Sequence, residues 1–158
     1  MEIERKFLIK YLPENLEKYS FHKIEQAYLC TNPVVRIRRQ DDEYILTWKG
    51  KGLMVREEYN LPLTEEGYYH LLKKADGNVI AKKRYLIPLS SDLKAEFDIF
   101  EGKFEGLRIV EVEFPDERTA AGFTIPDWFG EEVTYSRSYH NSVLSNLETF
   151  DPDHYPAV

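Results

Sequence analysis

Alternation of apolar and polar residues predicts that most of this chain forms β-strands. Successive side chains of a strand point to opposite faces of its sheet, so each alternating segment has one apolar and one polar face. In the first segment, Glu2, Glu4 and Lys6 share one face, and Ile3 and Phe7 share the other. The segments that alternate in this way are residues 1–9, 22–29, 34–40, 43–49, 54–61, 79–87, 94–100 and 107–114.

Three other segments show the features of helices. In the first of them Thr64 is a plausible N-cap, acids occupy the first turn and lysines the last, and this order suits the helix dipole. The helices are predicted over residues 64–75, 116–123 and 138–150. We expect residues 124–134 to be irregular and the tail, residues 151–158, to be mobile.

Composition and charge limit the class of protein. With 158 residues, 42% of them hydrophobic, we predict one domain over residues 1–150 with a proper core. The net charge of −7 argues against bulk binding to nucleic acid or to an anionic membrane, although it leaves room for a local basic pocket. Cys30 is the single cysteine, which rules out an intramolecular disulfide. With no apolar membrane span and an acidic N-terminus, the chain is expected to be cytoplasmic, as a monomer or a homodimer.

The polar faces of the strands carry acids and bases in pairs two residues apart. Arg36 with Arg38, and Glu2 with Glu4, are the first examples, and they put like charges about 7 Å apart. Such pairs are unfavourable unless an opposite charge or a ligand lies between them. Two arrangements are open. A flat sheet would leave these charges in water, whereas a curved sheet with its helices outside would gather them in a barrel.

The second arrangement would carry a specific chemistry. Arginine offers a planar fork to phosphate oxygens and lysine a point charge, so converging bases suit a polyanion. Carboxylates in the same cavity would suit Mg²⁺ or Mn²⁺, which prefer oxygen ligands and often bridge to substrate phosphates. Acids and bases in one cavity therefore indicate a metal together with a phosphate.

The charged motifs also follow one another in a recognisable order. They are Glu2-x-Glu4-x-Lys6, Arg36-x-Arg38, Lys49, Arg56 with Glu58, Lys82-x-Arg84-Tyr85, Asp98, Glu111-Val112-Glu113, Glu132-Val133-Thr134 and Tyr139-x-Asn141. Over roughly residues 1 to 147 this series resembles the CYTH superfamily, the triphosphate tunnel metalloenzymes. One departure is Ser138, where many relatives carry a basic residue before the tyrosine, and Arg137 is the candidate for that contact.

The resemblance implies a mainly β (α+β) fold, an eight-stranded antiparallel β-barrel that encloses a charged tunnel and has its helices packed outside. The substrate-binding residues that it implies are Lys6, Arg36, Arg38, Lys49, Arg56, Lys82, Arg84 and Arg137. The implied metal ligands are Glu2, Glu4, Glu58, Asp98, Glu111 and Glu113, with Glu58, Asp98 and Glu111 equally suited to hold arginines of the tunnel. The residues expected in catalysis are Glu4, Lys6, Arg38 and Lys82. Tyr28 is either a core aromatic or a contact over the substrate.

The function that the resemblance implies is Mg²⁺- or Mn²⁺-dependent hydrolysis of a linear triphosphate to diphosphate and phosphate. The short chain resembles the bacterial inorganic triphosphatases most, so inorganic tripolyphosphate is the expected substrate. The partner is a small molecule, and neither nucleic acid nor a membrane is expected. Three alternatives are open: a class IV-type adenylyl cyclase, a thiamine triphosphatase or nucleoside triphosphatase, and a non-catalytic binder of polyphosphate or nucleotide.

Overall fold

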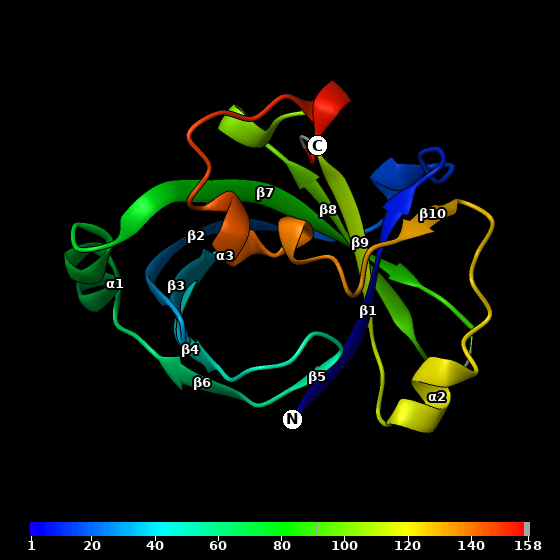
Figure 1. Ribbon diagram of the computed structural model, residues 1–158, viewed down its shortest axis with the longest axis horizontal. Helices are drawn as coiled ribbons and strands as arrows, with labels where there is room; N and C mark the ends of the chain where they lie inside the picture. Colours follow the sequence, from blue (N-terminus) through cyan, green and yellow to red (C-terminus); the bar gives the residue numbers. More distant parts are fainter. Residues whose placement is uncertain (91, 157–158) are drawn as a thin grey trace.

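The computed structural model describes residues 1–90 and 92–156, and in it one antiparallel sheet of ten strands curls into a barrel (Figure 1). The strands are β1 (Glu2–Ile9), β2 (Phe21–Thr31), β3 (Val34–Gln40), β4 (Glu43–Lys49), β5 (Val55–Arg56), β6 (Glu58–Pro62), β7 (Asp76–Pro88), β8 (Lys94–Phe100), β9 (Arg108–Glu113) and β10 (Phe129–Glu132). Neighbouring strands follow the order β10-β1-β9-β8-β7-β2-β3-β4-β6, and β5 pairs with β1.

The ring closes at β5. This strand continues into β6 with only Glu57 between them, yet it pairs with β1, so that Arg56 lies opposite Glu2. If β5 and β6 are counted as one bent strand, the ring has the eight strands that the sequence predicts. β10 lies outside the ring and pairs with the second half of β1, at Phe7 and Ile9. The prediction of a mainly β barrel is confirmed.

The helices are short and lie around the ring (Figure 1). They are α1 (Glu65–Leu72), α2 (Glu117–Ala121) and α3 (Asn141–Leu144), with 3-10 turns η1 (Leu16–Lys18), η2 (Gly102–Phe104), η3 (Arg137–Tyr139) and η4 (Pro152–His154). The predicted N-cap Thr64 accepts a hydrogen bond from the backbone N–H of Gly67 at 2.9 Å, and Asp116 caps α2 by accepting one from the backbone N–H of Thr119 at 2.6 Å.

The apolar faces of the strands supply the core. Phe7, Phe97 and Val110 are fully buried in a cluster of the outer face, which includes Ala120 of α2 and Phe129 of β10. On another side of the ring, Tyr68 of α1 is fully buried against Ala27 and Ile37. Because apolar side chains leave the sheet outward, the charged side chains of the same strands point into the ring.

Two expected elements differ from the structure. Residues 124–134, expected to be irregular, contain β10, and the helix expected over residues 138–150 is reduced to η3 and α3. The last helix ends early because Asn78 takes two of the backbone carbonyls that would continue it. Asn78 Nδ2 donates to the carbonyl of Leu144 at 3.2 Å, and the backbone N–H of Asn78 donates to that of Ser145 at 2.6 Å.

The C-terminal tail contacts the core through Tyr155. Its ring centroid lies 5.6 Å from that of Tyr139 and 5.1 Å from that of Phe150. Mobility of the tail stays a prediction, and residues 157–158 lie outside the described part. Among the described residues, none of the helices is both long enough and apolar enough to cross a membrane.

Candidate functional site

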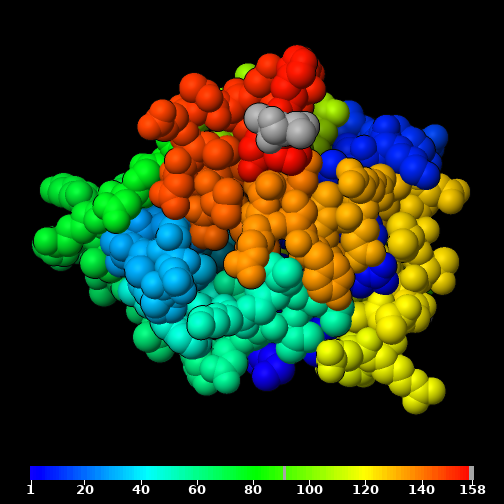
Figure 2. All heavy atoms as spheres, in the orientation of Figure 1, coloured from blue at the N-terminus to red at the C-terminus, as the bar shows by residue number. Residues whose placement is uncertain are grey.

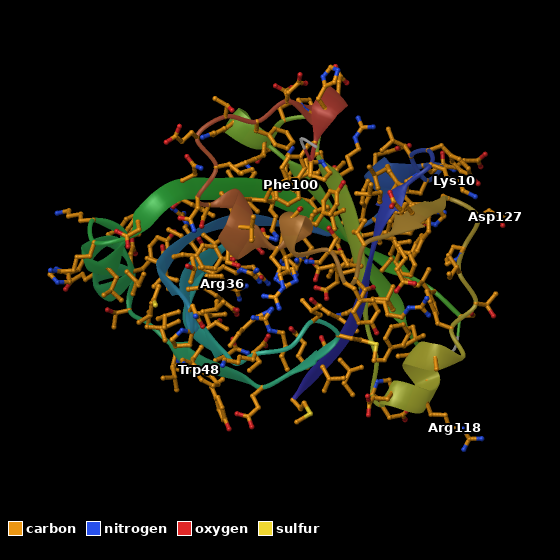
Figure 3. The ribbon with its side chains drawn as sticks, in the orientation of Figure 1. Lys10, Arg36, Trp48, Phe100, Arg118 and Asp127 are labelled. Carbon is orange, nitrogen blue, oxygen red and sulfur yellow. The ribbon has the colours of Figure 1, made fainter. Side chains whose placement is uncertain are left out.

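The inner faces of the strands surround a polar cavity of about 250 Å³. All but two of the residues predicted for the site line it, and Figure 3 shows one of them, Arg36, pointing toward the middle of the ring. These residues are Glu2, Glu4, Lys6, Arg36, Arg38, Lys49, Arg56, Glu58, Lys82, Arg84, Glu111 and Glu113. Of the two arrangements that alternation leaves open, the chain adopts the barrel. We call this space the tunnel cavity.

Asp98 and Arg137 are the two predicted residues outside the tunnel cavity. Asp98 is fully buried behind the wall, where its carboxylate accepts from Arg84 Nε at 2.7 Å, from Arg84 Nη2 at 2.9 Å and from Lys82 Nζ at 2.8 Å. Arg137 is exposed and lines a neighbouring cavity. In this structure Asp98 therefore holds two bases of the wall in place.

The two bases that share Asp98 respond to burial in different ways. Burial lowers the pKa of Arg84, but the carboxylates of Asp98 and Glu96 outweigh it and raise that pKa well above its ordinary value. Burial also lowers the pKa of Lys82, to about 7, because the positive charges of Arg84 and Arg38 largely cancel the help of Asp98. Arg84 is thus a fixed charge, whereas Lys82 can exchange a proton near neutral pH.

Acids crowd together where β1 meets β9. Glu4 lies opposite Glu113, and Lys6 lies opposite Glu111. Burial, followed by the negative charges of Glu111 and Glu2, raises the pKa of Glu4 well above its ordinary value. Burial raises the pKa of Glu111 too, but Lys6 and a neighbouring arginine outweigh it and hold that pKa well below the ordinary value. On this wall Glu111 therefore keeps its negative charge beside Lys6 and Arg84, whereas Glu4 favours its protonated form.

A second acidic pair faces Lys49. The lysine Nζ donates to Glu2 Oε1 at 3.0 Å and lies 3.3 Å from Glu58 Oε2. Burial and a hydrogen bond to Glu58 raise the pKa of Glu2 to about 7. Burial would raise the pKa of Glu58 as well, but the hydrogen bond from Glu2 and the charge of Lys49 bring it to about 2. Of these two acids, Glu2 is therefore the one that binds a proton more tightly, and Glu58 accepts the hydrogen bond.

Two amide side chains, of which the sequence singled out only Asn141, orient bases of the cavity. Arg38 Nε donates to Gln26 Oε1 at 2.8 Å, and Gln26 Nε2 donates to Asn141 Oδ1 at 3.0 Å. The same Asn141 oxygen accepts from Lys82 Nζ at 3.0 Å. Asn141 belongs to the C-terminal motif of the sequence, whereas Gln26 gives no signal beyond a polar residue in a strand.

Tyr28 and His140 also line the tunnel cavity. Tyr28 is 3% exposed and is part of an apolar cluster, so it contributes both to the core and to the wall. Burial, and then the positive charges of Lys6 and Arg56, lower the pKa of His140 to about 4. His140 is therefore neutral at neutral pH.

Two arginines have nitrogen atoms without a hydrogen-bond partner. Within the described residues, the Nε atoms of Arg36 and Arg56 are buried and unpaired. Arg36 Nη2 donates to Thr47 Oγ1 at 3.2 Å, which leaves the rest of its guanidinium directed at the cavity. A buried donor without an acceptor costs free energy, so both arginines indicate a site for an anionic ligand.

The acids of the cavity are the donors that a hard divalent cation prefers. Among the described residues, no three His, Cys, Asp or Glu side chains lie close enough together to hold a metal ion. Mg²⁺, however, is usually held by one or two carboxylates together with phosphate oxygens and water. The hydrogen-bonded pair Glu4 and Glu111 fits that donor set, and a cation would relieve the repulsion that raises the pKa of Glu4.

Comparison of the sequence with known families and proteins gives consistent matches. The family model described as "CYTH domain" matches residues 1–148. An inorganic triphosphatase of Nitrosomonas europaea is 36% identical over 149 residues, which cover 91% of this chain and 96% of the relative. An inorganic triphosphatase of Acetivibrio thermocellus is 36% identical over 149 residues, which cover 90% of this chain and 92% of the relative.

Solved structures resemble the fold over most of its length. The crystal structure of an inorganic triphosphatase matches with a TM-score of 0.71 and 33% identity, over 95% of this chain and 97% of that one. A protein of Pyrococcus horikoshii matches with a TM-score of 0.59 over 96% of this chain and 95% of that one. At 17% identity, this second match concerns the fold alone.

Proposed function

The chain belongs to the CYTH domain family, and we propose that it is a metal-dependent hydrolase that cleaves inorganic tripolyphosphate to diphosphate and phosphate. The observation that carries this proposal is the tunnel cavity, where bases from five of the strands surround a space and two arginines keep unpaired donors. Both curated relatives at 36% identity are inorganic triphosphatases, which supports the same reaction.

The bases would bind the phosphate oxygens of the substrate. Arg36 and Arg56 have unpaired donors, and Lys6, Arg38 and Lys82 line the same cavity. Little covalent chemistry is asked of the protein in phosphoryl transfer, so positioning and charge stabilisation supply most of the rate. Because these side chains are buried and already oriented, they would stabilise the charge that develops on the departing diphosphate at little reorganisation cost.

The acids would hold Mg²⁺ or Mn²⁺. We assign this role to Glu2, Glu4, Glu111 and Glu113. Glu58 would add a further negative charge beside Glu2 and Lys49. A divalent ion held there would supply Lewis-acid chemistry for the phosphoryl transfer and would make water a better nucleophile. Asp98 would act indirectly, since its oxygens hold Lys82 and Arg84 toward the substrate.

A turnover assay tests the proposal. The pure protein is incubated with Mg²⁺ or Mn²⁺ and with tripolyphosphate, ATP or thiamine triphosphate, and phosphate and cyclic AMP are both measured. We expect phosphate to be released from tripolyphosphate with the highest kcat/KM, and only when a metal is added. Cyclic AMP and diphosphate without tripolyphosphate turnover would identify a cyclase instead. Tight binding of all three compounds without turnover would identify a non-catalytic binder.

A further inference from the structure

A row of polar side chains crosses three neighbouring strands on the inner face of the barrel. Arg36 of β3 lies opposite Thr47 of β4, and Thr47 lies opposite Asn60 of β6. Glu58 is two residues before Asn60, so its side chain leaves the same face of β6. We call these four residues the polar row. Arg36, Asn60 and Glu58 line the tunnel cavity, and Thr47 is fully buried.

Hydrogen bonds join the polar row from one end to the other. Arg36 Nη2 donates to Thr47 Oγ1 at 3.2 Å, and Thr47 Oγ1 donates to Asn60 Oδ1 at 2.6 Å. Asn60 Nδ2 donates to Glu58 Oε1 at 2.8 Å. A hydroxyl has a single proton, so the proton that Thr47 gives to Asn60 leaves its lone pairs free to accept from Arg36. The polar row therefore runs in one direction, from a cation to a carboxylate.

Thr47 is the contact that holds the guanidinium of Arg36. Within the described residues, no other hydrogen bond or ion pair engages that side chain, and its Nε is buried without a partner. Arg84, by comparison, is held through two of its nitrogens by Asp98 alone. An arginine with one contact keeps its other donors for a ligand, but its orientation depends on that contact.

The other end of the polar row belongs to the acidic part of the tunnel cavity. Glu58 Oε2 lies 3.3 Å from Lys49 Nζ, which also donates to Glu2 Oε1 at 3.0 Å. Figure 2 shows the dark blue start of the chain against the blue-green segment of β5 and β6, where these acids meet. The polar row thus connects an arginine that we assign to phosphate with carboxylates that we place beside the metal.

We propose that Thr47 and Asn60 are positioning residues, which fix the guanidinium of Arg36 in place for a phosphate oxygen of the substrate. Glu58 attracts the amide N–H of Asn60, so the amide oxygen faces Thr47 and takes its hydroxyl proton. The hydroxyl then remains as an acceptor for Arg36. Hydrogen bonds in such a series polarise one another, which strengthens the last of them. The inference rests on the proposed function, because it takes Arg36 as a ligand of the substrate.

Thr47→Val tests the role of the hydroxyl, because valine has nearly the same shape and cannot accept from Arg36. We expect kcat/KM for tripolyphosphate to fall roughly tenfold, the size of one lost hydrogen bond to a charged group. Thr47→Ser keeps the hydroxyl and should restore most of the activity. Equal losses in the two variants would assign the effect to packing and overturn the inference, as would wild-type activity in Thr47→Val.

The matched control is Thr124→Val, which removes a hydroxyl from an exposed position outside the tunnel cavity. We expect it to keep the kcat/KM of the wild type. Urea denaturation of each variant shows whether the fold is intact. A loss of activity in the control as large as that in Thr47→Val would overturn the inference.

A double-mutant cycle with Arg36→Met shows whether Thr47 acts through Arg36. Methionine removes the guanidinium, so the hydroxyl has nothing left to position in this background. We therefore expect Thr47→Val to lower kcat/KM by less than about twofold when Arg36 is absent. The same cost in both backgrounds would mean that Thr47 acts elsewhere, and it would overturn the inference.

Asn60→Leu tests the second step of the polar row. The amide is lost, but the hydroxyl of Thr47 is still present, so the loss of affinity for tripolyphosphate should be smaller than in Thr47→Val. Because the two residues act in series, the double variant Thr47→Val/Asn60→Leu should bind no more weakly than Thr47→Val alone. Losses that multiply would show two independent contacts and would overturn the role of Asn60.

Binding measured without a divalent metal separates this inference from the proposed function. By calorimetry, Thr47→Val should raise the Kd for tripolyphosphate at least roughly threefold in the presence of Arg36 and leave it unchanged in Arg36→Met. If this pattern is seen in a protein that does not hydrolyse tripolyphosphate, the positioning role stands and the proposed function fails. If tripolyphosphate is hydrolysed but the Kd changes equally in both backgrounds, the reverse holds.

Discussion

Burial and charged neighbours give the glutamates of the tunnel cavity very different proton affinities. The pKa values of Glu2 and Glu4 are raised, by burial first and then by neighbouring acids. The pKa values of Glu58 and Glu111 are lowered, because their hydrogen bonds and the nearby bases outweigh burial. Glu58 and Glu111 therefore lose their protons more readily than Glu2 and Glu4, and a metal ion that binds Glu2 or Glu4 would compete with a proton.

Glu4→Gln tests the metal-binding role of Glu4, one of the two glutamates whose pKa is raised. Glutamine has the shape of the protonated acid and cannot take the charge that attracts a cation, so we expect metal-dependent hydrolysis to fall at least ~100-fold. Without metal, the free energy of unfolding should not fall, because the variant removes the repulsion from Glu111 and Glu2. Phosphate release and urea denaturation measure the two effects. The exposed Glu101→Gln is the control, and full activity of Glu4→Gln would remove Glu4 from the metal site.

Gln26→Leu tests the hydrogen bonds by which Gln26 connects Arg38 with Asn141. Leucine has nearly the same volume but cannot accept from Arg38 or donate to Asn141. A lost hydrogen bond to a charged group is worth about 1.5–3 kcal/mol, so we expect kcat/KM for tripolyphosphate to fall roughly 10- to 100-fold. A second variant, Gln26→Asn, keeps the amide group on a shorter side chain, and its kcat/KM can be compared with that of the wild type. Activity within twofold of the wild type in Gln26→Leu would show that Arg38 needs no such support.

The sequence predicts the charged residues of the cavity better than the neutral ones. Residues two apart on a strand share a face, so Arg36 with Arg38 can be assigned to one face from the chain alone. Gln26 and Asn141 are 115 residues apart, and their contact depends on the C-terminal segment folding back onto β2. An amide in a strand carries no charge pattern, and nothing local distinguishes a buried one from an exposed one.

At the scale of elements, β1 joins three strands along its two edges. β9 occupies one edge, and β5 and β10 share the other. Arg5 strengthens the second half of that shared edge. Its Nε and Nη2 donate to Glu132 of β10 at 2.9 and 2.6 Å, and its Nη1 donates to the carbonyl of Ala120 in α2 at 2.8 Å. One outward side chain thus ties β1, β10 and α2 together.

Arg5→Lys should loosen this junction without changing the chemistry of the cavity. Lysine keeps the charge but cannot make the two-pronged contact with Glu132, so we expect the free energy of unfolding to fall by about 1–2 kcal/mol. The contact is partly exposed, which keeps the expected loss small. Urea denaturation measures it, and Arg118→Lys, an exposed arginine of α2, is the control. A loss confined to kcat, with unchanged stability, would contradict this structural role.

Elements that depend on distant partners are the ones that the sequence misses. β10 has only the residues Phe129–Glu132, too few to show alternation, and it is a strand because β1 offers it a free edge. The helix expected over residues 138–150 has the right apolar spacing, but Asn78 of the distant β7 takes the carbonyls of Leu144 and Ser145. The longer strands were predictable because their own residues alternate between apolar and polar. α1 was predictable because its own residues include the apolar helical spacing and the N-cap Thr64.

At the scale of the whole molecule, the direction of the charged face could not be predicted from periodicity. A flat sheet and a barrel both bury one face of every strand, so alternation fits either of them. The decision rests on closure of the ring, which is made by the two residues of β5 against Glu2 and Ile3. Closure brings the like charges of separate strands into one space, and so the fold itself creates the cost that a bound ligand would relieve.

The pH dependence of stability measures this cost. The folded-state pKa of Glu2 is about 7 against an ordinary 4.5, so the folded protein holds this proton more tightly than the unfolded chain. The contribution of Glu2 is therefore full below about pH 4.5 and is lost as the pH rises through about 7. His140, whose pKa is lowered, acts in the opposite sense between about 4 and 6.5, but it is present equally in a Glu2 variant and cancels in a comparison.

Glu2→Gln should remove this dependence, because glutamine stays neutral at every pH. Without metal, we expect wild type and variant to differ little near pH 5, and the variant to be more stable by roughly 1–3 kcal/mol near pH 8. Adding Mg²⁺ near pH 8 should stabilise the wild type more than the variant and narrow the gap, since a ligand that binds only the folded state adds its binding free energy. Urea denaturation measures each value. A gap that stays constant across this pH range would show that the charge of Glu2 is already compensated in the folded protein.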